Sequence, residues 1–203
     1  ALVANLLQFS RRAQPQISTV DVRQEIANTL ELIHYHLRNR RITVAQEFAP
    51  DVPLIQADRQ QLRQLFLNLF TNASDAMPEG GTLTIRVGVW DARNSAGGMG
   101  EAPARPYPHT PIHVFIEVAD TGQGIAPEDL PKVTEPFFTT KPEGKGTGLG
   151  LAICRRIVQE HGGTLDIASE GVPGQGTIVR LTLPYKNGSN SVYLKETRGG
   201  ILP

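Results

Sequence analysis

The chain has 203 residues, of which 39% are hydrophobic and 20% charged, with 20 Gly and 15 Pro. This length suits one domain of about 100–150 residues with extensions, and the composition excludes a disordered chain, a collagen and a long coiled coil. Twenty basic against twenty acidic residues give a formal net charge of zero, which excludes the broad positive field of a surface for nucleic acid or anionic lipid. We therefore expect no nucleic-acid partner.

The cysteine count and the hydropathy indicate the compartment. Cys154 is the single cysteine of the chain, so an intrachain disulfide framework and a cysteine-built zinc site are excluded, and an intracellular location is expected. No stretch approaches the roughly 18 consecutive apolar residues of a membrane span. The first residue already lies in an apolar periodic run with no capping residue before it, so we expect the chain to be part of a longer protein.

Hydrophobic periodicity predicts helices that alternate irregularly with mostly antiparallel strands. In chain order, the expected elements are a helix end over 2–10, a strand over 17–20, a helix over 22–38, a strand over 42–48, a helix over 58–77, strands over 82–90 and 113–119, a short helix near 127–133, a helix over 149–161, and strands over 164–169 and 177–183. Asp58 is the expected N-cap of the third of these helices, with Gln61 at the capping-box position. The pattern predicts an α+β sandwich with helices on one face of a mixed sheet.

The chain divides into one expected domain and two extensions. Residues 17–185 hold all of the predicted strands, and we expect the domain there. A Gly- and Pro-rich stretch at 92–111 is unusually long for a loop and is expected to be an insertion. Residues 1–16 are expected to be a helix end with a linker, and the tail 186–203 has no clear period and stays unassigned.

Two asparagines, Asn68 and Asn72, lie four residues apart on the predicted 58–77 helix, so both amides project to one side. Satisfied amides on a helix surface are one interpretation, and the commoner one for such a pair alone. Their carbonyl oxygens also suit a hard cation such as Mg²⁺, which is usually shared with the phosphates of a substrate. Asp75, one turn further, either assists such a site or faces solvent.

A carboxylate ends the predicted 113–119 strand, in the sequence Asp120-Thr-Gly-Gln-Gly124. A half-buried anion costs free energy unless it accepts hydrogen bonds. One interpretation is an aspartate that caps its own turn, which is common in such sequences. The other is a carboxylate that accepts a hydrogen bond from an amino group on a flat heterocycle, with Gly122 and Gly124 allowing close approach of the backbone.

Glycines at alternate positions in the stretch Gly144–Leu151 lead into the last predicted helix and suit a phosphate at its positive N-terminus. Lys141 and Lys145, two of only five lysines in the chain, lie in the same region and would supply positive charge. The segment is not a Walker loop, because G-x-x-x-x-G-K-[ST] does not occur and no parallel βαβ unit surrounds it. A plain Gly-rich linker is the alternative.

In this order and spacing, the motifs resemble those of the histidine-kinase branch of the GHKL ATP-binding superfamily. Asn68–Ala73 is similar to its N box, Asp120–Gly124 to the G1 box, Glu135–Phe138 to the F box and Gly146–Leu151 to the G2 box. The resemblance covers about residues 19–185, and the F and G2 boxes look like those of short-lidded, nitrogen-regulation sensor kinases. It implies a Bergerat-type two-layer α/β sandwich, with ATP and Mg²⁺ as cofactors and phosphoryl transfer to a histidine.

The resemblance also implies roles for single residues. Asn72 would be the principal Mg²⁺ ligand, Asn68 its neighbour at the phosphates, Asp120 the partner of the adenine amino group, and Thr177 a second adenine contact. Phe137 would anchor a mobile lid together with Phe138, a buried Phe pair being the alternative. The other expected nucleotide contacts are Asp75, Gly122, Gly124, Ile125, Phe138, Lys141, Lys145, Gly146, Thr147, Gly148, Leu149, Gly150 and Leu151. We expect the two asparagines and Lys141 to be the catalytic residues.

Two positions depart from the family pattern. Many members carry Lys or Arg where this chain has Asp75, so neutralisation of the phosphates must depend more on the metal and the lid lysines. The hydrolases of the superfamily (gyrase, mismatch-repair ATPases and heat-shock chaperones) place a glutamate base where Asn68 stands. An asparagine cannot act as a base, which favours transfer to a protein acceptor over hydrolysis.

The acceptor histidine of the family is absent, because none of the five histidines lies in an H-E/D-x-x-[NT]-P context. All five are expected to be structural, and Cys154 to be a core thiol. Residues 1–14 resemble the last turns of a second dimerisation helix.

The implied partners are therefore the dimerisation and histidine phosphotransfer domain of the same protein and the receiver domain of a response regulator. We expect this fragment to be cytoplasmic and monomeric. The parent protein is expected to be a homodimer, and the sequence leaves open whether that parent is anchored to a membrane. The alternatives are an ATP-gated regulatory module without phosphoryl transfer and a serine-phosphorylating anti-sigma-type kinase.

Overall fold

A computed structural model describes residues 15–91, 112–142 and 146–185. The expected helix end over 2–10, the 92–111 stretch, Lys145 and the 186–203 tail lie outside the described residues. The elements are β1 (Ile17–Val20), α2 (Val22–Asn39), β2 (Ile42–Phe48), β3 (Ile55–Asp58), α3 (Arg59–Ala76), β4 (Gly81–Asp91), β5 (Ile112–Asp120), α4 (Gly150–Glu160), β6 (Thr164–Ser169) and β7 (Thr177–Pro184).

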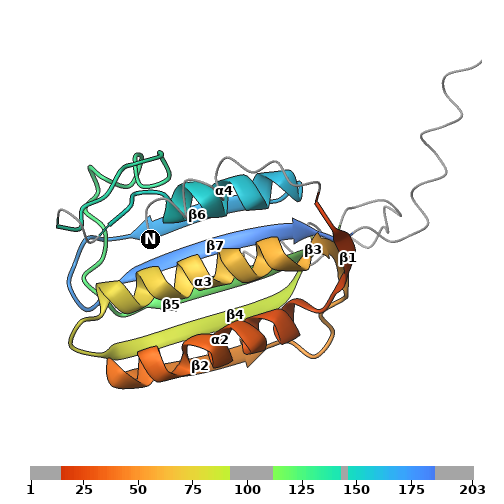
Figure 1. Ribbon diagram of the computed structural model, residues 1–203, viewed down its shortest axis with the longest axis horizontal. Coiled ribbons are helices and arrows are strands. Elements are labelled where there is room, and N and C mark those ends of the chain that lie inside the picture. The colour runs from red at the N-terminus through yellow and green to blue at the C-terminus, as the bar shows by residue number, and fades with distance from the viewer. Residues whose placement is uncertain (1–14, 92–111, 143–145, 186–203) are drawn as a thin grey trace, which may run out of the picture.

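A five-stranded mixed sheet forms one layer and three helices form the other. The strand order is β2-β4-β5-β7-β6, with β2 parallel to β4 and the other neighbours antiparallel. Helices α2, α3 and α4 lie side by side on one face of this sheet, and β1 pairs with β3 at one end of the helical layer (Figure 1). The predicted α+β sandwich is confirmed. No helix among the described residues is long and apolar enough to cross a membrane.

Helix α3 lies at the centre of the core. Its apolar stripe at helical spacing includes Leu62, Leu65, Phe66, Leu69 and Phe70, all at most 2% exposed. The rings of Phe66 and Phe70 stack with centroids 6.1 Å apart. Each such side chain contributes about 1.5–3 kcal/mol by burial, so the stripe fixes the rotation of α3 about its axis. Because this rotation is fixed, the amides on its neighbouring face are held at the edge of the core.

The N-terminus of α3 is capped by Asp58, as the sequence predicts. Asp58 Oδ1 accepts hydrogen bonds from the backbone N–H groups of Gln60 and Gln61, at 2.9 and 3.1 Å. The capping-box role of Gln61 is wrong, because its side-chain oxygen accepts no hydrogen bond from Asp58, while its amide nitrogen donates to Glu160 at 3.2 Å. The backbone N–H of Asp58 instead donates to Nε2 of His161 at 3.0 Å. A side chain from the end of α4 thus does what a third-position glutamine does in a local box.

Two further differences from the expected elements have local causes. Strand β3 was not expected, because it has only four residues and depends on pairing with β1. The short helix expected near 127–133 is a pair of turns, closed by hydrogen bonds from Leu130 to Ala126 and from Val133 to Asp129. Pro131 lies between these turns and has no backbone N–H, so the helix cannot continue.

Candidate functional site

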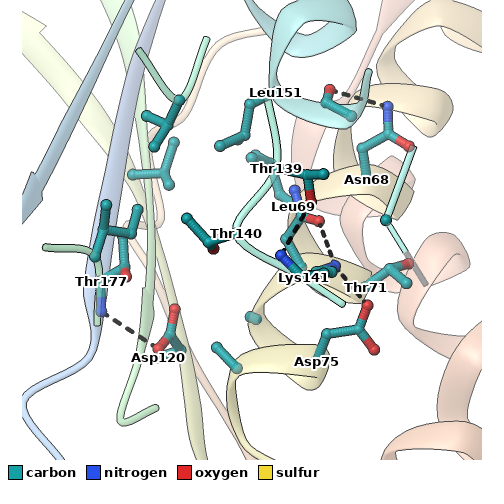
Figure 2. Close-up of a pocket in the computed structure, with 18 of the residues that line it drawn as sticks. Asn68, Leu69, Thr71, Asp75, Asp120, Thr139, Thr140, Lys141, Leu151 and Thr177 are labelled. Atoms are coloured by element: carbon teal, nitrogen blue, oxygen red, sulfur yellow. Dashed lines mark hydrogen bonds and ion pairs between the residues drawn. The ribbon is translucent and has the colours of Figure 1, made fainter. Parts of the chain in front are cut away.

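A cleft of about 1040 Å³ opens between α3, the N-terminus of α4 and the ends of β5 and β7. Figure 2 shows Asp120 and Thr177 on one wall and Asn68 and Asp75 on the other, with Lys141 reaching in between. This volume lies at the upper end of the range for small-molecule and cofactor sites. Motifs separated by about half the chain therefore meet in one cavity.

The cleft brings together most of the predicted nucleotide contacts. Its lining includes Asn68, Asn72, Asp75, Asp120, Gly124, Ile125, Phe138, Lys141, Gly146, Thr147, Gly148, Gly150, Leu151 and Thr177. Gly122 and Leu149 are not among the lining residues, and Leu149 is 1% exposed in the core. Lys145 lies outside the described residues.

Asp120 is a nearly buried carboxylate at the base of the cleft. Its Oδ1 accepts hydrogen bonds from the backbone N–H groups of Gly122, at 2.8 Å, and Thr177, at 3.3 Å. Both of these bonds go to the same oxygen, which leaves Oδ2 for a donor in the cleft. Burial raises the pKa of Asp120 above its ordinary value, although the two backbone hydrogen bonds act in the opposite direction. A ligand amino group would relieve this cost by donating to the carboxylate.

The glycines around Asp120 are required by protein packing. A Cβ at Gly122 would lie 2.5 Å from the carbonyl oxygen of Ala76 at the end of α3. Gly176 has φ of +67°, and a Cβ there would overlap the carbonyl of Asp120. These close approaches hold the end of β5 against α3 and β7, so Asp120 is fixed in position. Only Gly124 of the two predicted glycines faces the cleft.

The opposite end of the cleft joins α3 to the N-terminus of α4. The amide of Asn68 donates to the carbonyl of Gly150 at 3.4 Å, and a Cβ at Gly150 would lie 3.4 Å from the amide nitrogen of Asn72. Leu149, the N-cap of α4, provides no side-chain cap. The first-turn N–H groups and the helix dipole therefore favour an anion at this place.

Charged side chains of opposite sign meet beside the two asparagines. The Lys141 ammonium contacts Asp75 Oδ2 at 2.7 Å and the side-chain oxygen of Asn72 at 3.4 Å. Arg40 contacts Asp75 Oδ1 at 3.1 Å and donates to the carbonyl of Ser74 at 2.8 Å. Asp75 therefore takes part in the site and does not simply face solvent.

Arg40 is the functional candidate that sequence reasoning missed. It follows α2 and lines the cleft from a part of the chain in which no motif was found. It supplies a cation near the place where many family members carry a basic residue and this chain has Asp75. The sequence signal was a group of arginines at the end of the predicted 22–38 helix, which is also typical of a helix C-terminus.

The F and G2 boxes are joined through their backbones. The N–H of Phe137 donates to the carbonyl of Gly148 at 2.8 Å, and a Cβ at Gly148 would overlap the Phe137 backbone. Phe137 is 64% exposed, so the alternative of a buried Phe pair is wrong. Phe138 lines the cleft. The expected anchoring of a lid by these two residues stays a prediction.

The donor set at the phosphate end fits a magnesium ion that is shared with a ligand. The amide oxygen of Asn72 and the carboxylate of Asp75 are the oxygen donors that this hard cation prefers, and both already contact the positive charge of Lys141. Among the described residues, no group of three or more His, Cys, Asp or Glu could hold a metal. Two protein oxygens suit a metal that keeps several waters and binds phosphate.

Cys154 belongs to the core beneath the site. Its side chain is fully buried in α4, and its thiol lies 3.7 Å from the carbonyl oxygen of Leu65. Burial raises the pKa of Cys154 to about 12. A thiol that stays protonated is a poor nucleophile, so the expected core thiol is confirmed.

Residues 57–187 match the family described as histidine kinase-, DNA gyrase B-, and HSP90-like ATPase. The chain belongs to this family. The matched range begins within β3 and ends beyond β7, so it contains α3, Asp120 and the N-terminus of α4. The membership that the four motifs predict is confirmed.

Curated relatives of the chain include sensor kinases. The chain is 39% identical over 184 residues to the sensor kinase CckA of Brucella abortus (strain 2308), covering 91% of this chain and 19% of that protein. It is 34% identical over 183 residues to the sensor histidine kinase ZraS of Klebsiella oxytoca, covering 90% of this chain and 35% of that protein. The chain therefore spans a minor part of the curated relatives that it matches.

Solved histidine kinases share the fold of this chain. The structure of full-length ShkA in complex with AMPPNP aligns with a TM-score of 0.72 and 27% identity, covering 92% of this chain and 35% of that chain. The catalytic domain of the histidine kinase ThkA in a nucleotide-free form aligns with a TM-score of 0.63 and 26% identity, covering 85% of this chain and 99% of that chain. The Bergerat-type sandwich implied by the motifs agrees with both.

Proposed function

We propose that the domain binds ATP with Mg²⁺ in this cleft and transfers the γ-phosphoryl group to a histidine on the dimerisation domain of the same protein, from which a response regulator receives it. The observation that carries the proposal is that one cleft is lined by Asp120 at one end and by the two N-box asparagines, Asn68 and Asn72, at the other. The sensor kinase relatives and the AMPPNP bound by ShkA support it.

Adenine would bind at the Asp120 end. The exocyclic amino group of adenine donates hydrogen bonds, and Asp120 has a carboxylate oxygen available to accept one. Thr177 lies beside it, with its backbone N–H already bonded to Asp120 and its side chain at the cleft wall. A guanine presents a carbonyl at the corresponding position, so the ionised carboxylate would repel it and favour adenine.

The phosphates would bind at the α4 end, where the uncapped helix N-terminus and Gly146, Gly148 and Gly150 allow close approach of the backbone. Asn72 would be the principal ligand of the Mg²⁺, with Asp75 as the second oxygen donor and Asn68 as the neighbour at the phosphates. When bound, the ion supplies neutralisation of the charge that develops on the transferred phosphoryl group. Lys141 and Arg40 would add positive charge from the chain itself.

The choice between transfer and hydrolysis depends on Asn68. Its amide nitrogen donates to the backbone of α4, and an amide has no basic site with which to activate water. Transfer to a nucleophile supplied by another domain is therefore favoured over hydrolysis within this one. An ATP-gated regulatory module without transfer is the second candidate, and the kinase interpretation fits the sensor kinase relatives better.

The remaining expectations belong to the same proposal. Residues 17–185 form the catalytic domain, and the acceptor histidine lies in the longer protein, since this chain covers only 19% of CckA and 35% of ZraS. We further propose a cytoplasmic domain that is monomeric alone, a homodimeric parent, and the nitrogen-regulation subtype of sensor kinase. Sedimentation of the fragment tests the first of these oligomeric states, and a stable dimer would contradict it.

The test of the function has two parts. Calorimetric titration with AMPPNP, with and without Mg²⁺, should show metal-dependent binding that Asp120→Asn weakens and that Asp166→Asn, an exposed carboxylate on β6, leaves unchanged. The domain should then label the dimerisation domain of its parent from [γ-³²P]ATP, with an acid-labile, alkali-stable phosphate. Nucleotide binding without labelling would favour the regulatory module.

A further inference from the structure

A cation of the protein itself lies among the oxygens of the expected metal site. The Lys141 ammonium is 2.7 Å from Asp75 Oδ2 and 3.4 Å from Asn72 Oδ1, and Figure 2 shows Lys141 beside Asp75. Its side chain is 33% exposed and that of Asp75 28%, so the contacts are partly shielded from water. One amide oxygen and one carboxylate are donors that a hard divalent cation also takes.

Asp75 is shared between Lys141 and Arg40, but the two cations are held differently. Arg40 contacts Oδ1 and also donates to the carbonyl of Ser74 at the end of α3. Lys141 contacts Oδ2 from a segment outside the helices and strands. Because its ammonium is a compact charge on a flexible stem, Lys141 can move to another anion while Arg40 keeps Asp75 in place.

We propose that Lys141 is an internal substitute for the divalent cation, bound to Asn72 and Asp75 in the nucleotide-free protein and displaced by the metal that accompanies the nucleotide. The inference rests on the proposed function, since it concerns the metal of that same site. An ammonium and a divalent cation cannot occupy the same two oxygens, because like charges a few Å apart repel. With two cations on one carboxylate, the three charged side chains carry a net charge of +1.

The consequence is that metal and nucleotide bind together. A metal ion alone must remove Lys141 from its oxygens and gives the ammonium no new anion. With a nucleotide, the displaced ammonium gains phosphate oxygens, which form charge-assisted hydrogen bonds. The metal by itself is therefore expected to bind weakly. Lys141 thus favours binding of the metal–nucleotide complex over binding of the metal alone.

The experiment measures the binding of Mn²⁺ alone, without nucleotide, by electron paramagnetic resonance of the free ion. Lys141→Met removes the ammonium and keeps the length of the side chain, and it should bind Mn²⁺ at least tenfold more tightly than the wild type. The matched control is Lys132→Met, which removes the same charge from an exposed residue and should match the wild type. Adding Asp75→Asn to Lys141→Met should abolish the gain.

Three results would overturn the inference: no tighter binding in Lys141→Met, an equal gain in Lys132→Met, or a gain that survives Asp75→Asn. Circular dichroism and the thermal midpoint verify that each variant is folded. The failure of the proposed function is a different result, namely the absence of AMPPNP binding to the wild type with Mg²⁺. The Mn²⁺ measurement contains no nucleotide, so the two failures are distinguishable.

Discussion

Helices α3 and α4 lie side by side, and the two ends of this pair differ in how their polar groups are satisfied. At the cap end, where α3 begins and α4 stops, Asp58 accepts three backbone N–H groups, from Gln16, Gln60 and Gln61, over both of its oxygens. At the cleft end, Asp120 accepts two hydrogen bonds, both at Oδ1. The two aspartates are almost equally buried, at 7% and 9% exposed.

The comparison shows that burial alone does not distinguish a carboxylate satisfied within the protein from one proposed to bind a ligand. What differs is the hydrogen-bonding capacity that the protein leaves unused. The Asp58 carboxylate accepts from backbone N–H groups of two separated segments, and the backbone N–H of Asp58 donates to His161. Asp120 keeps an oxygen for a donor in the cleft, and its burial raises its pKa above the ordinary value. The cap end should therefore control stability, and the cleft end should control binding.

The largest effect is expected for Asp58→Ala at the cap end. The substitution removes three hydrogen bonds and leaves the N-terminus of α3 uncapped, which should lower the free energy of unfolding by about 2–4 kcal/mol. Urea unfolding followed by circular dichroism measures the change. Asp21→Ala, which removes the cap of α2, should cost only about 1 kcal/mol. Equal losses in the two variants would contradict the central role of Asp58.

The next effect concerns binding, and it should leave stability intact. Asp120→Asn keeps an oxygen for the N–H groups of Gly122 and Thr177 but turns an amide towards the ligand. Losing a charge-assisted hydrogen bond should weaken AMPPNP binding by about 1.5–3 kcal/mol, measured by calorimetry. The thermal midpoint should not fall. A large loss of stability with unchanged affinity would reverse the roles assigned to the two ends.

The pH dependence of the same variant sharpens this contrast. The raised pKa of Asp120 means that ionisation costs folding free energy. Its contribution to stability is fully present below the pKa of the unfolded chain and is lost as pH rises through the folded pKa. Wild type should therefore lose stability relative to Asp120→Asn over that window, while its affinity for AMPPNP rises. Titrations and unfolding curves from pH 4 to 8, in both proteins, measure the two opposite trends.

A smaller effect is expected for His161→Phe. Nδ1 of His161 must donate to the carbonyl of Ile157, at 2.8 Å, so Nε2 accepts from Asp58. Phenylalanine keeps the ring but leaves both backbone groups without this partner, which should cost about 1–2 kcal/mol of unfolding free energy. AMPPNP affinity should stay within twofold, because the cleft lies at the other end of α4. A large fall in affinity of the folded variant would show that the two ends are coupled.

The smallest effect is expected on the solvent-facing side of the sheet. Glu117 bonds to Arg86 at 2.6 Å and Arg180 at 2.8 Å, and although partial burial acts to raise its pKa, these arginines hold the pKa of Glu117 below its ordinary value. Glu117→Gln should cost at most about 1 kcal/mol. Because the pKa is lowered by folding, this contribution is present near neutral pH and disappears as pH falls through the folded pKa. Urea unfolding at pH 7 and pH 3 measures the difference.

The sequence predicted which residues line the cleft better than it predicted the contacts that these residues make with the rest of the protein. Asn68 and Asn72 were found because helical spacing places them on one side of α3, and Asp120 because a carboxylate ending an apolar strand needs a partner. Arg40 was missed because nothing local relates it to Asp75, which lies 35 residues further along the chain. Gly122 was expected at the base, yet its missing Cβ is needed against Ala76, a contact that no spacing rule reveals.

By itself, the sequence determined the features that depend on neighbours along the chain: the helical faces, the N-cap at Asp58, the alternating strands, and the family to which the motifs belong. Only the tertiary structure decided which partners these groups take. It placed His161 on Asp58, Arg40 and Lys141 on Asp75, and the N-terminus of α4 against Asn72. The physical reason is that local propensities act over a few residues, whereas hydrogen bonds and charges act between whatever atoms packing of the core brings within reach.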